Sequence, residues 1–418
     1  MFARVNLRMT RFAGSFTQVQ TAGKLHRIES LRGFAGIYVA VGHILNVHFG
    51  NPLWGLPGRF AAEVVILFFL ISGFVIRYTT RDETSIAEYL FKRFRRIYPL
   101  FFLTLILSWG FDSLAERQLL PFNLPQFLGN VLMLQDFGLK RPGVWVECFH
   151  NSALWSLSYE WWFYLFFIPL LKWKVSLNIK TAAVYAISLA CAGMYFVYPS
   201  QFGWFGVYFS VWWAGALLAD EYRNTGKVTL LRQFPSVAVL GLIALIFCIP
   251  LLHMPRAEWQ FGLFPLIDIR RFAAAAAIIM IGCLWRGTGW CGFAWTFGPF
   301  MMFAPLTYGL YILHFPVLVL INAQPWASNH LLFLVVCVPL LLLIAYLGEV
   351  VLQSAINQWT EPWLVHIKAK HARTSALITP APASRPQPPI PHPTPASLAR
   401  LRRYPGCDSP GSPSDEHP

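Results

Sequence analysis

The chain has 418 residues, of which 56% are hydrophobic and 12% are charged, and its formal net charge is +14. Soluble domains carry about 25% charged residues, so this composition, with a mean hydropathy of +0.50, excludes an ordinary soluble globule and predicts a multi-span membrane protein. The basic excess indicates cytoplasmic loops, not a nucleic-acid partner. The seven cysteines contain no Cys-x-x-Cys pair and favour neither a disulfide framework nor a metal site.

Ten apolar segments follow a polar and basic stretch at residues 1–26, and each is near the ~20 residues that a helix needs to cross a bilayer. We therefore predict an all-α integral membrane protein with about ten transmembrane helices. The segments are expected at 33–49, 60–78, 97–115, 151–171, 180–198, 203–220, 235–252, 266–285, 299–321 and 330–352.

The basic residues predict the orientation of these segments. With the N-terminus inside, the Lys- and Arg-rich stretches 77–96, 172–174, 221–232 and 285–290 all fall on the cytoplasmic side. This bias predicts that both termini are cytoplasmic. The segment DIRR (268–271) is an exception at an outer end, and it indicates either a functional patch or a later start of the eighth span.

Three regions are expected along the chain. Residues 1–26 form a basic N-terminal segment, and residues 27–352 form one membrane domain. Residues 353–418 form a cytoplasmic tail, which is rich in Pro and Ser and is expected to be disordered from about residue 379.

The first expected span begins with charges and encloses a histidine. Arg32 and His43 are eleven residues apart, which is three turns plus about 20°, so both lie on one helix face, about 16 Å apart along the axis. Beside this face, Gly33, Gly36 and Ala40 allow another helix to approach closely. An ionisable group inside a membrane usually faces a cavity or a polar partner, so His43 is a candidate functional residue. The alternative is a simple interhelical hydrogen bond.

Two arginines occur three positions apart before the third span. Arg93 and Arg96 project together from one helix face. Guanidinium groups bind phosphate oxygens in a two-pronged geometry, so this pair is a candidate anion clamp. The alternative is a basic anchor that sets the orientation of the span.

The fourth span contains a carboxylate. Glu160 has Ser156 four positions before it and Tyr164 four positions after it, all on one face. A carboxylate inside a membrane needs a polar partner, and a histidine on another span is a candidate. The alternative is a structural hydrogen-bond network between helices.

The ninth span carries Tyr311 and His314 along one stripe. Pro316 follows and should kink the helix and free a backbone carbonyl. Packing is the favoured role for Tyr311, whereas His314 fits either packing or function. In the second span, the Ser72-Gly73 pair permits close packing or a kink.

Five motifs follow one another within residues 27–350. They are SLRGFAGIYVAVGH, FFLISGF, the Arg-x-x-Arg of RFRRIYP, LWSLSYEWWFYL and YGLYILHFP. In this order they resemble the acyltransferase-three family of integral membrane O-acyltransferases. The chain departs from the family pattern at Glu29, where Asp is usual, at Ile66, a place that is often acidic, at Lys92 and at Trp161.

The resemblance implies a ten-span protein of the bacterial cytoplasmic (inner) membrane that moves an acyl group, often acetyl, from acyl-coenzyme A (acyl-CoA) to a hydroxyl. We expect acyl-CoA as a co-substrate, the lipid bilayer as surroundings, and no permanently bound cofactor or metal. The expected acceptor is a cell-surface carbohydrate or a lipid-linked glycan. A small secondary metabolite is the alternative acceptor.

The resemblance maps Arg32, His43, Arg93 and Arg96 onto functional positions. We interpret His43 as the general base that takes the proton of the acceptor hydroxyl, and the three arginines as ligands of the acyl-CoA phosphates. Glu160 is expected to orient His43 and stabilise its imidazolium. A covalent acyl-histidine is an alternative route. Supporting roles are expected for Glu29, Ser72, Ser156, Tyr311 and His314.

Two rival functions also fit a membrane chain with buried polar groups. A transporter or flippase for a lipid-linked glycan uses buried His, Glu and Arg as well. The five ordered motifs favour the enzyme, and consumption of acyl-CoA distinguishes the two. An inactive membrane scaffold is the third hypothesis, and it requires that His43 is dispensable.

Overall fold

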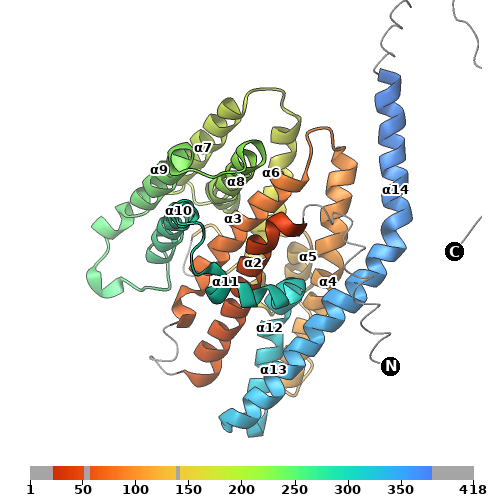
Figure 1. The fold of residues 1–418 in the computed structure, drawn as a ribbon. Coiled ribbons are helices and arrows are strands. Elements are labelled where there is room, and N and C mark those ends of the chain that lie inside the picture. The colour runs from red at the N-terminus through yellow and green to blue at the C-terminus, as the bar shows by residue number, and fades with distance from the viewer. Residues whose placement is uncertain (1–21, 51–56, 138–141, 379–418) are drawn as a thin grey trace, which may run out of the picture. The chain divides into compact units, whose positions relative to one another are not determined.

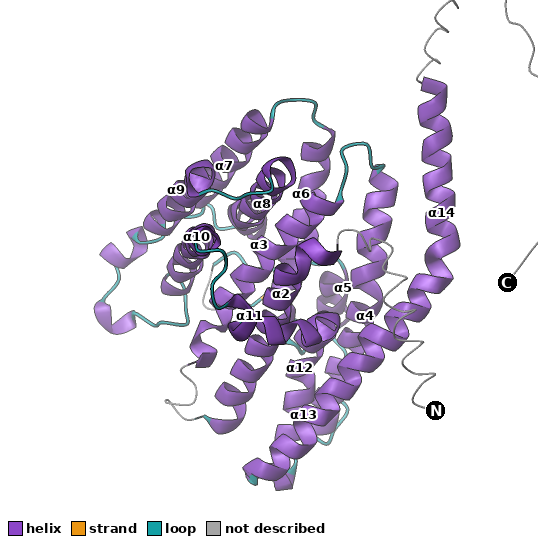
Figure 2. Cartoon of the chain, in the orientation of Figure 1, coloured by secondary structure: helices purple, strands orange, loops and turns teal. Residues whose placement is uncertain are grey.

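The computed structural model describes residues 22–50, 57–137 and 142–378, and these residues are almost entirely helical (Figure 1, Figure 2). The strands in this part of the chain are β1 (Gln135–Asp136) and β2 (Val146–Glu147), a short parallel pair. The Pro-rich tail from residue 379, which we expect to be disordered, lies outside the described residues.

The helices are connected mostly by short loops. The long helices are α2 (Ala22–Ile44), α3 (Ala61–Thr79), α4 (Ile86–Ala115), α5 (Leu124–Val131), α6 (Trp155–Lys172), α7 (Leu177–Met194), α8 (Gln201–Thr225), α9 (Leu230–Ile246), α10 (Leu266–Gly287), α12 (Thr307–Asn322), α13 (His330–Tyr346) and α14 (Gln353–Ile378). Short helical pieces are η1 (Leu45–Phe49), η2 (Pro57–Phe60), η3 (Ser152–Leu154), η4 (Ile249–Leu252), η5 (Arg256–Glu258), α11 (Phe293–Thr296), η6 (Gly298–Leu306), η7 (Pro325–Ser328) and η8 (Leu347–Leu352).

Serine side chains mark several helix starts. Ser85 accepts a hydrogen bond from the backbone N–H of Glu88 at 3.1 Å at the start of α4, and Ser200 does the same for Gly203 at 3.1 Å at the start of α8. Each satisfies an N–H group that has no partner inside the helix. At its other end, α8 stops at Gly226, whose φ of 65° suits glycine.

Each of the ten predicted spans coincides with helical structure. The first helix begins earlier than expected, at Ala22 and not near residue 33. Of the described helices, seven are long and apolar enough to cross a membrane by length and composition. The predicted spans outside that set lie in α2, α6 and α10, whose Arg, Glu, Asp, Ser or aromatic residues lower the hydropathy. The described chain is thus an all-α protein with membrane-spanning character.

Glycines set the closest helix crossings, as the sequence predicted for Gly73. A Cβ atom at Gly73 on α3 would overlap the carbonyl oxygen of Trp212 on α8. The reciprocal glycine, Gly215, lies against the carbonyl oxygen of Leu70 in the same way. These two glycines therefore allow the backbones of α3 and α8 to touch. Gly33 on α2 makes a similar approach to η6.

The ends of α3, α6, α8 and α10 lie together on one side of the bundle. Arg77 at the end of α3 donates to Asp220 near the end of α8 at 2.9 Å. Lys172 at the end of α6 donates to the carbonyl oxygen of Thr84 at 2.7 Å, and Arg286 of α10 donates to the carbonyl oxygen of Gly226 at 3.2 Å. The basic loops that we predicted to lie on the cytoplasmic side are thus neighbours in space.

The DIRR segment is part of α10, whose first residue is Leu266. Arg270 forms an ion pair with Glu63 at the start of α3. Arg271 is buried, lies 3.3 Å from the carboxylate of Asp268 and stacks 4.3 Å above the ring of Trp155. These contacts give the segment a structural role in tying α10 to α3 and α6.

The chain divides into two compact units. The first is Met1–Lys368, and it contains all the residues of the site described below. The second is Ala369–Pro418, of which the structure describes only the last turns of α14, up to Ile378.

Candidate active site

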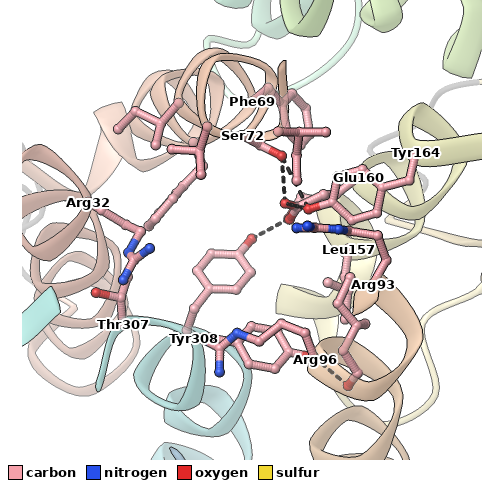
Figure 3. A pocket seen from close by; sticks show the side chains of 17 residues that line it. Arg32, Phe69, Ser72, Arg93, Arg96, Leu157, Glu160, Tyr164, Thr307 and Tyr308 are labelled. Carbon is pink, nitrogen blue, oxygen red and sulfur yellow. Dashed lines mark hydrogen bonds between the residues drawn. The ribbon is translucent and has the colours of Figure 1, made fainter. Parts of the chain in front are cut away.

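A cavity of about 180 Å³ lies among α2, α3, α4, α6 and α12 (Figure 3). Seven of the ten site residues predicted from the sequence line it: Arg32, Ser72, Arg93, Arg96, Ser156, Glu160 and Tyr311. Residues more than 250 positions apart in the chain therefore meet around one space. The rest of the lining is mainly apolar, with Phe68, Phe69, Ile71, Val75, Ile76, Ile97 and Leu157 among its members.

Arg32 faces the cavity from α2 (Figure 3). Its guanidinium lies 2.7 Å from the carboxylate of Glu29, one turn earlier on the same helix. It also donates to the carbonyl oxygen of Ala304 at 3.1 Å. Glu29 does not line the cavity, and its contact with Arg32 fits the supporting role expected for it.

Arg93 and Arg96 both reach the cavity from α4 (Figure 3). They differ in their partners. Arg96 forms a two-pronged ion pair with Glu349, with N···O distances of 2.6 and 3.1 Å. Arg93 instead lies over the rings of Tyr89 and Tyr164, at 5.8 and 5.9 Å. Within the described residues its Nε has no hydrogen-bond partner and no carboxylate lies at ion-pair distance, so Arg93 is available to an incoming anion.

Sequence reasoning missed Glu349, whose side chain is only 2% exposed. It belongs to the π-helix η8, a helix form found frequently at functional sites. Besides binding Arg96, it accepts the backbone N–H of Gly309 on α12 at 2.9 Å. The signal in the sequence was a lone carboxylate inside the apolar run LLLLIAYLGEVVL.

Glu160 lies in the cavity wall with two hydroxyl partners. Ser72 on α3 donates to its Oε1 at 2.8 Å, and the hydroxyl of Tyr164 donates to the same oxygen. The indole N–H of Trp212 donates to Ser72 at 3.1 Å and completes the group. The expected pairing of Glu160 with His43 is not formed among the described residues, because the Oε1 of Glu160 pairs with hydroxyl groups and His43 does not line the cavity.

Tyr311 closes the wall next to the second predicted serine. Its hydroxyl lies 2.6 Å from the Oγ of Ser156, so Ser156 pairs with α12 and not with Glu160 on its own helix. The ring of Tyr311 is 5.6 Å from that of Phe68. On the other side, its ring centroid is 6.1 Å from that of His314. Tyr311 therefore stands between the cavity and the histidine.

His43 and His314 are not among the residues that line the cavity, but they contact each other. The Nε2 of His314 is 3.2 Å from the Nδ1 of His43, and their ring centroids are 4.9 Å apart. His314 is buried, and His43 is half-buried. Because α2 is a continuous α-helix from Arg32 to His43, the two lie about 16 Å apart along its axis.

The backbone carbonyl that Pro316 was predicted to free is found in the structure. Proline has no N–H to bond the carbonyl oxygen four residues earlier. That carbonyl belongs to Ile312, and it accepts a hydrogen bond from the amide of Asn151 at 2.8 Å. The part of α12 that carries His314 is thus fixed to the segment before α6.

The arrangement combines cations and a base at two depths. Arginines at one level can bind an anion in two-pronged geometry. An imidazole pair about 16 Å away along α2 can accept and return a proton.

Comparison with known proteins identifies the family. The model of the acyltransferase domain (Acyl_transf_3) matches residues 25–349. Over 151 residues the chain is 33% identical to acyltransferase MdmB of Streptomyces mycarofaciens, covering 34% of this chain and 38% of that protein. Over 189 residues it is 28% identical to nodulation protein 10 of Rhizobium leguminosarum bv. viciae, covering 41% of this chain and 51% of that protein.

The matched stretches span about half or less of the two curated relatives. No solved structure matches the chain significantly. The domain match, in contrast, extends over most of the chain and includes every residue of the candidate site. The chain therefore belongs to the acyltransferase-3 family, whose members transfer acyl groups other than amino-acyl groups.

Proposed function

We propose that the chain transfers an acyl group, in the simplest case acetyl, from acyl-CoA to a hydroxyl of a cell-surface carbohydrate or a lipid-linked glycan. The observation that carries this proposal is the convergence of Arg32, Arg93 and Arg96 on one cavity. Arg93 in particular has no hydrogen-bond partner at its Nε within the described residues. The phosphates of acyl-CoA are the anions that such a site suits.

The site belongs at the cytoplasmic side of a ten-span fold in the bacterial inner membrane, with both termini in the cytoplasm. Basic loops gather at the ends of α3, α6, α8 and α10, and this supports the orientation. Arg93 and Arg96 come shortly after the loop that follows α3, so they lie near that side. A donor from the cytosol enters there.

Chemistry then takes place deeper, at His43. With the phosphates at the arginines, the flexible pantetheine arm carries the thioester along α2 toward His43, about 16 Å away. His43 takes the proton of the acceptor hydroxyl while that oxygen forms a bond to the thioester carbonyl carbon. The carbon–sulfur bond then breaks, and the leaving thiolate receives the proton from the imidazolium.

Glu160 takes a different part from the one expected from the sequence. Its carboxylate lies in the cavity with Ser72 and Tyr164, and it has no hydrogen bond to His43 among the described residues. We assign it to the wall along which the donor lies, where its free acceptor capacity suits amide N–H or hydroxyl groups of the donor.

Mass spectrometry of glycans, lipids and small metabolites tests this function. Cells with and without the gene are compared, and the cells are fed isotope-labelled acetate. A glycan or lipid that carries one labelled acyl group only in the presence of the gene supports the proposal and names the acceptor. A labelled small metabolite would correct the acceptor class. Loss of glycan transport with no missing acyl group would favour a flippase and contradict the proposal.

A further inference from the structure

The contacts of His43 and His314 show which ring nitrogen of each histidine carries the proton, because each ring also faces a backbone carbonyl. The Nδ1 of His314 lies 3.1 Å from the carbonyl oxygen of Leu310. The Nδ1 of His43 lies 2.9 Å from the carbonyl oxygen of Val39. Both carbonyls are one turn earlier on the same helix as the histidine that they face.

A carbonyl oxygen only accepts hydrogen bonds, so both Nδ1 atoms carry the proton. In a neutral imidazole the other nitrogen then has a lone pair. For His314 this nitrogen is Nε2, which lies 3.2 Å from the Nδ1 of His43. The N–H of His43 is thus shared between the carbonyl oxygen of Val39 and the Nε2 of His314, and the network is consistent at every atom.

This network leaves one nitrogen for chemistry. The Nε2 of His43 carries a lone pair, and no described residue donates a hydrogen bond to it. His43 is also half-buried, whereas His314 is only 1% exposed. The two histidines are therefore not equivalent: His43 can contact a substrate, whereas His314 contacts only protein.

The ring of His314 is held firmly enough to impose this choice. The hydrogen bond from Asn151 to the carbonyl oxygen of Ile312 fixes α12 two residues before it. Tyr311, one turn before it, is fixed by Ser156. A packed and hydrogen-bonded surrounding is what a group needs in order to orient a base.

We infer that His314 is the positioning residue of the reaction: together with the carbonyl oxygen of Val39 it holds the Nδ1–H tautomer and the ring orientation of His43, and this leaves Nε2 as the nitrogen that takes the acceptor's proton. The inference rests on the proposed function of His43 as a general base. When Nε2 of His43 gains the proton from the hydroxyl, the lone pair of His314 and the carbonyl of Val39 stabilise the imidazolium through its Nδ1–H. The proton returns from Nε2 to the leaving thiolate, and His314 itself gains and loses none.

Kinetics of three variants test the inference in nanodiscs with acetyl-CoA. His314→Ala removes one of the two acceptors of the Nδ1–H of His43 and leaves only the carbonyl oxygen of Val39. It should lower kcat by about tenfold or more, within the ~10²–10⁴-fold that a general base contributes, while the KM for acetyl-CoA stays unchanged. His314→Gln restores an acceptor oxygen and should recover much of kcat. His330→Ala is the matched control, because His330 also pairs with a histidine of the first helical segment, His48, at 3.0 Å, and it should keep kcat.

A wild-type kcat in His314→Ala, or a changed KM with an unchanged kcat, would overturn the inference. If His314→Ala gave one of these results while His43→Ala lost kcat, the proposed function of His43 would still hold and only the role of His314 would be wrong. A second measurement is independent of turnover. Nitrogen NMR of wild-type protein with isotope-labelled histidine, with the His43 signals identified from His43→Ala, should show a protonated Nδ1 and an unprotonated Nε2. The opposite tautomer would contradict the assignment.

Discussion

Glu349 binds Arg96 with both carboxylate oxygens, and the N···O distances are 2.6 and 3.1 Å. One of those oxygens also accepts the backbone N–H of Gly309. The π-helix η8, the third span in α4 and α12 are therefore joined through one buried carboxylate. This contact fixes the direction in which Arg96 faces the cavity.

Glu349→Ala should lower the free energy of unfolding by about 1–3 kcal/mol, because it leaves the N–H of Gly309 and part of the Arg96 guanidinium without a partner. The measurement is thermal unfolding of purified protein in detergent. Glu361→Ala is the matched control. Glu361 is 52% exposed and pairs with Arg95 at 3.0 Å, so its loss should cost ~0–1 kcal/mol. Equal melting shifts in the two variants would contradict the role assigned to Glu349.

Lysine at both Arg93 and Arg96 should weaken the binding of acyl-CoA while the protein still inserts. If the pair only anchors the span, charge is sufficient and lysine serves as well. If it clamps phosphates, the planar fork matters. Losing part of two charge-assisted hydrogen bonds, at roughly 1.5–3 kcal/mol each, should raise the dissociation constant about tenfold or more, since 1.4 kcal/mol is a factor of ten.

The matched control for this prediction is Arg95→Lys. Arg95 lies on the same helix, but it pairs with Glu361 and does not line the cavity. Its replacement should leave the binding of acyl-CoA unchanged. Equal affinities for the double variant and the wild type, measured by titration in nanodiscs, would return Arg93 and Arg96 to the role of a topology anchor.

Gly73→Ala should destabilise the bundle, because the new Cβ overlaps the carbonyl oxygen of Trp212 and forces α3 and α8 apart. Overpacking of this kind typically costs about 1–3 kcal/mol. Gly110→Ala is the comparison, since a Cβ there meets nothing within 4 Å and the residue lies inside α4. It should stabilise the helix by about 0.5–1 kcal/mol. Melting temperatures that move in the same direction would contradict the close crossing.

Single cysteines should report the orientation of the chain. Gln118→Cys, in the segment after α4, should react with an impermeant thiol reagent added to intact cells. Lys174→Cys, after α6, should react only once the membrane is opened, because it belongs to the basic side. The seven native cysteines are replaced in both proteins. The reverse labelling would put the arginines on the wrong side for cytosolic acyl-CoA.

Much of the fold was predictable because the length of an apolar segment and the spacing of residues along a helix are properties of the local sequence. The helices, the close approach at Gly73 and the carbonyl freed by Pro316 follow from residue types and spacing. The gathering of Arg32, Arg93 and Arg96 was also expected, although only as a consequence of the family resemblance.

Partners across helices were less predictable, since several groups compete for each polar atom. Glu160 was expected to meet His43, but the hydroxyls of Ser72 and Tyr164 occupy its Oε1. His43 meets His314 instead. Glu349 was overlooked because a single carboxylate in an apolar run has no spacing relation to the residue that it binds.

Release of free thiol from acetyl-CoA by the purified protein is a direct test of acyl transfer with His43 as the general base. The protein is placed in nanodiscs with a glycan and lipid extract from cells that lack the gene, and wild type is compared with His43→Ala at equal yield and melting temperature. We expect the wild type to release thiol. In His43→Ala the rate of release should be lower by about 10²–10⁴-fold, which is the usual contribution of a general base. Equal rates in the two proteins, or no release by the wild type with any extract, would contradict this assignment.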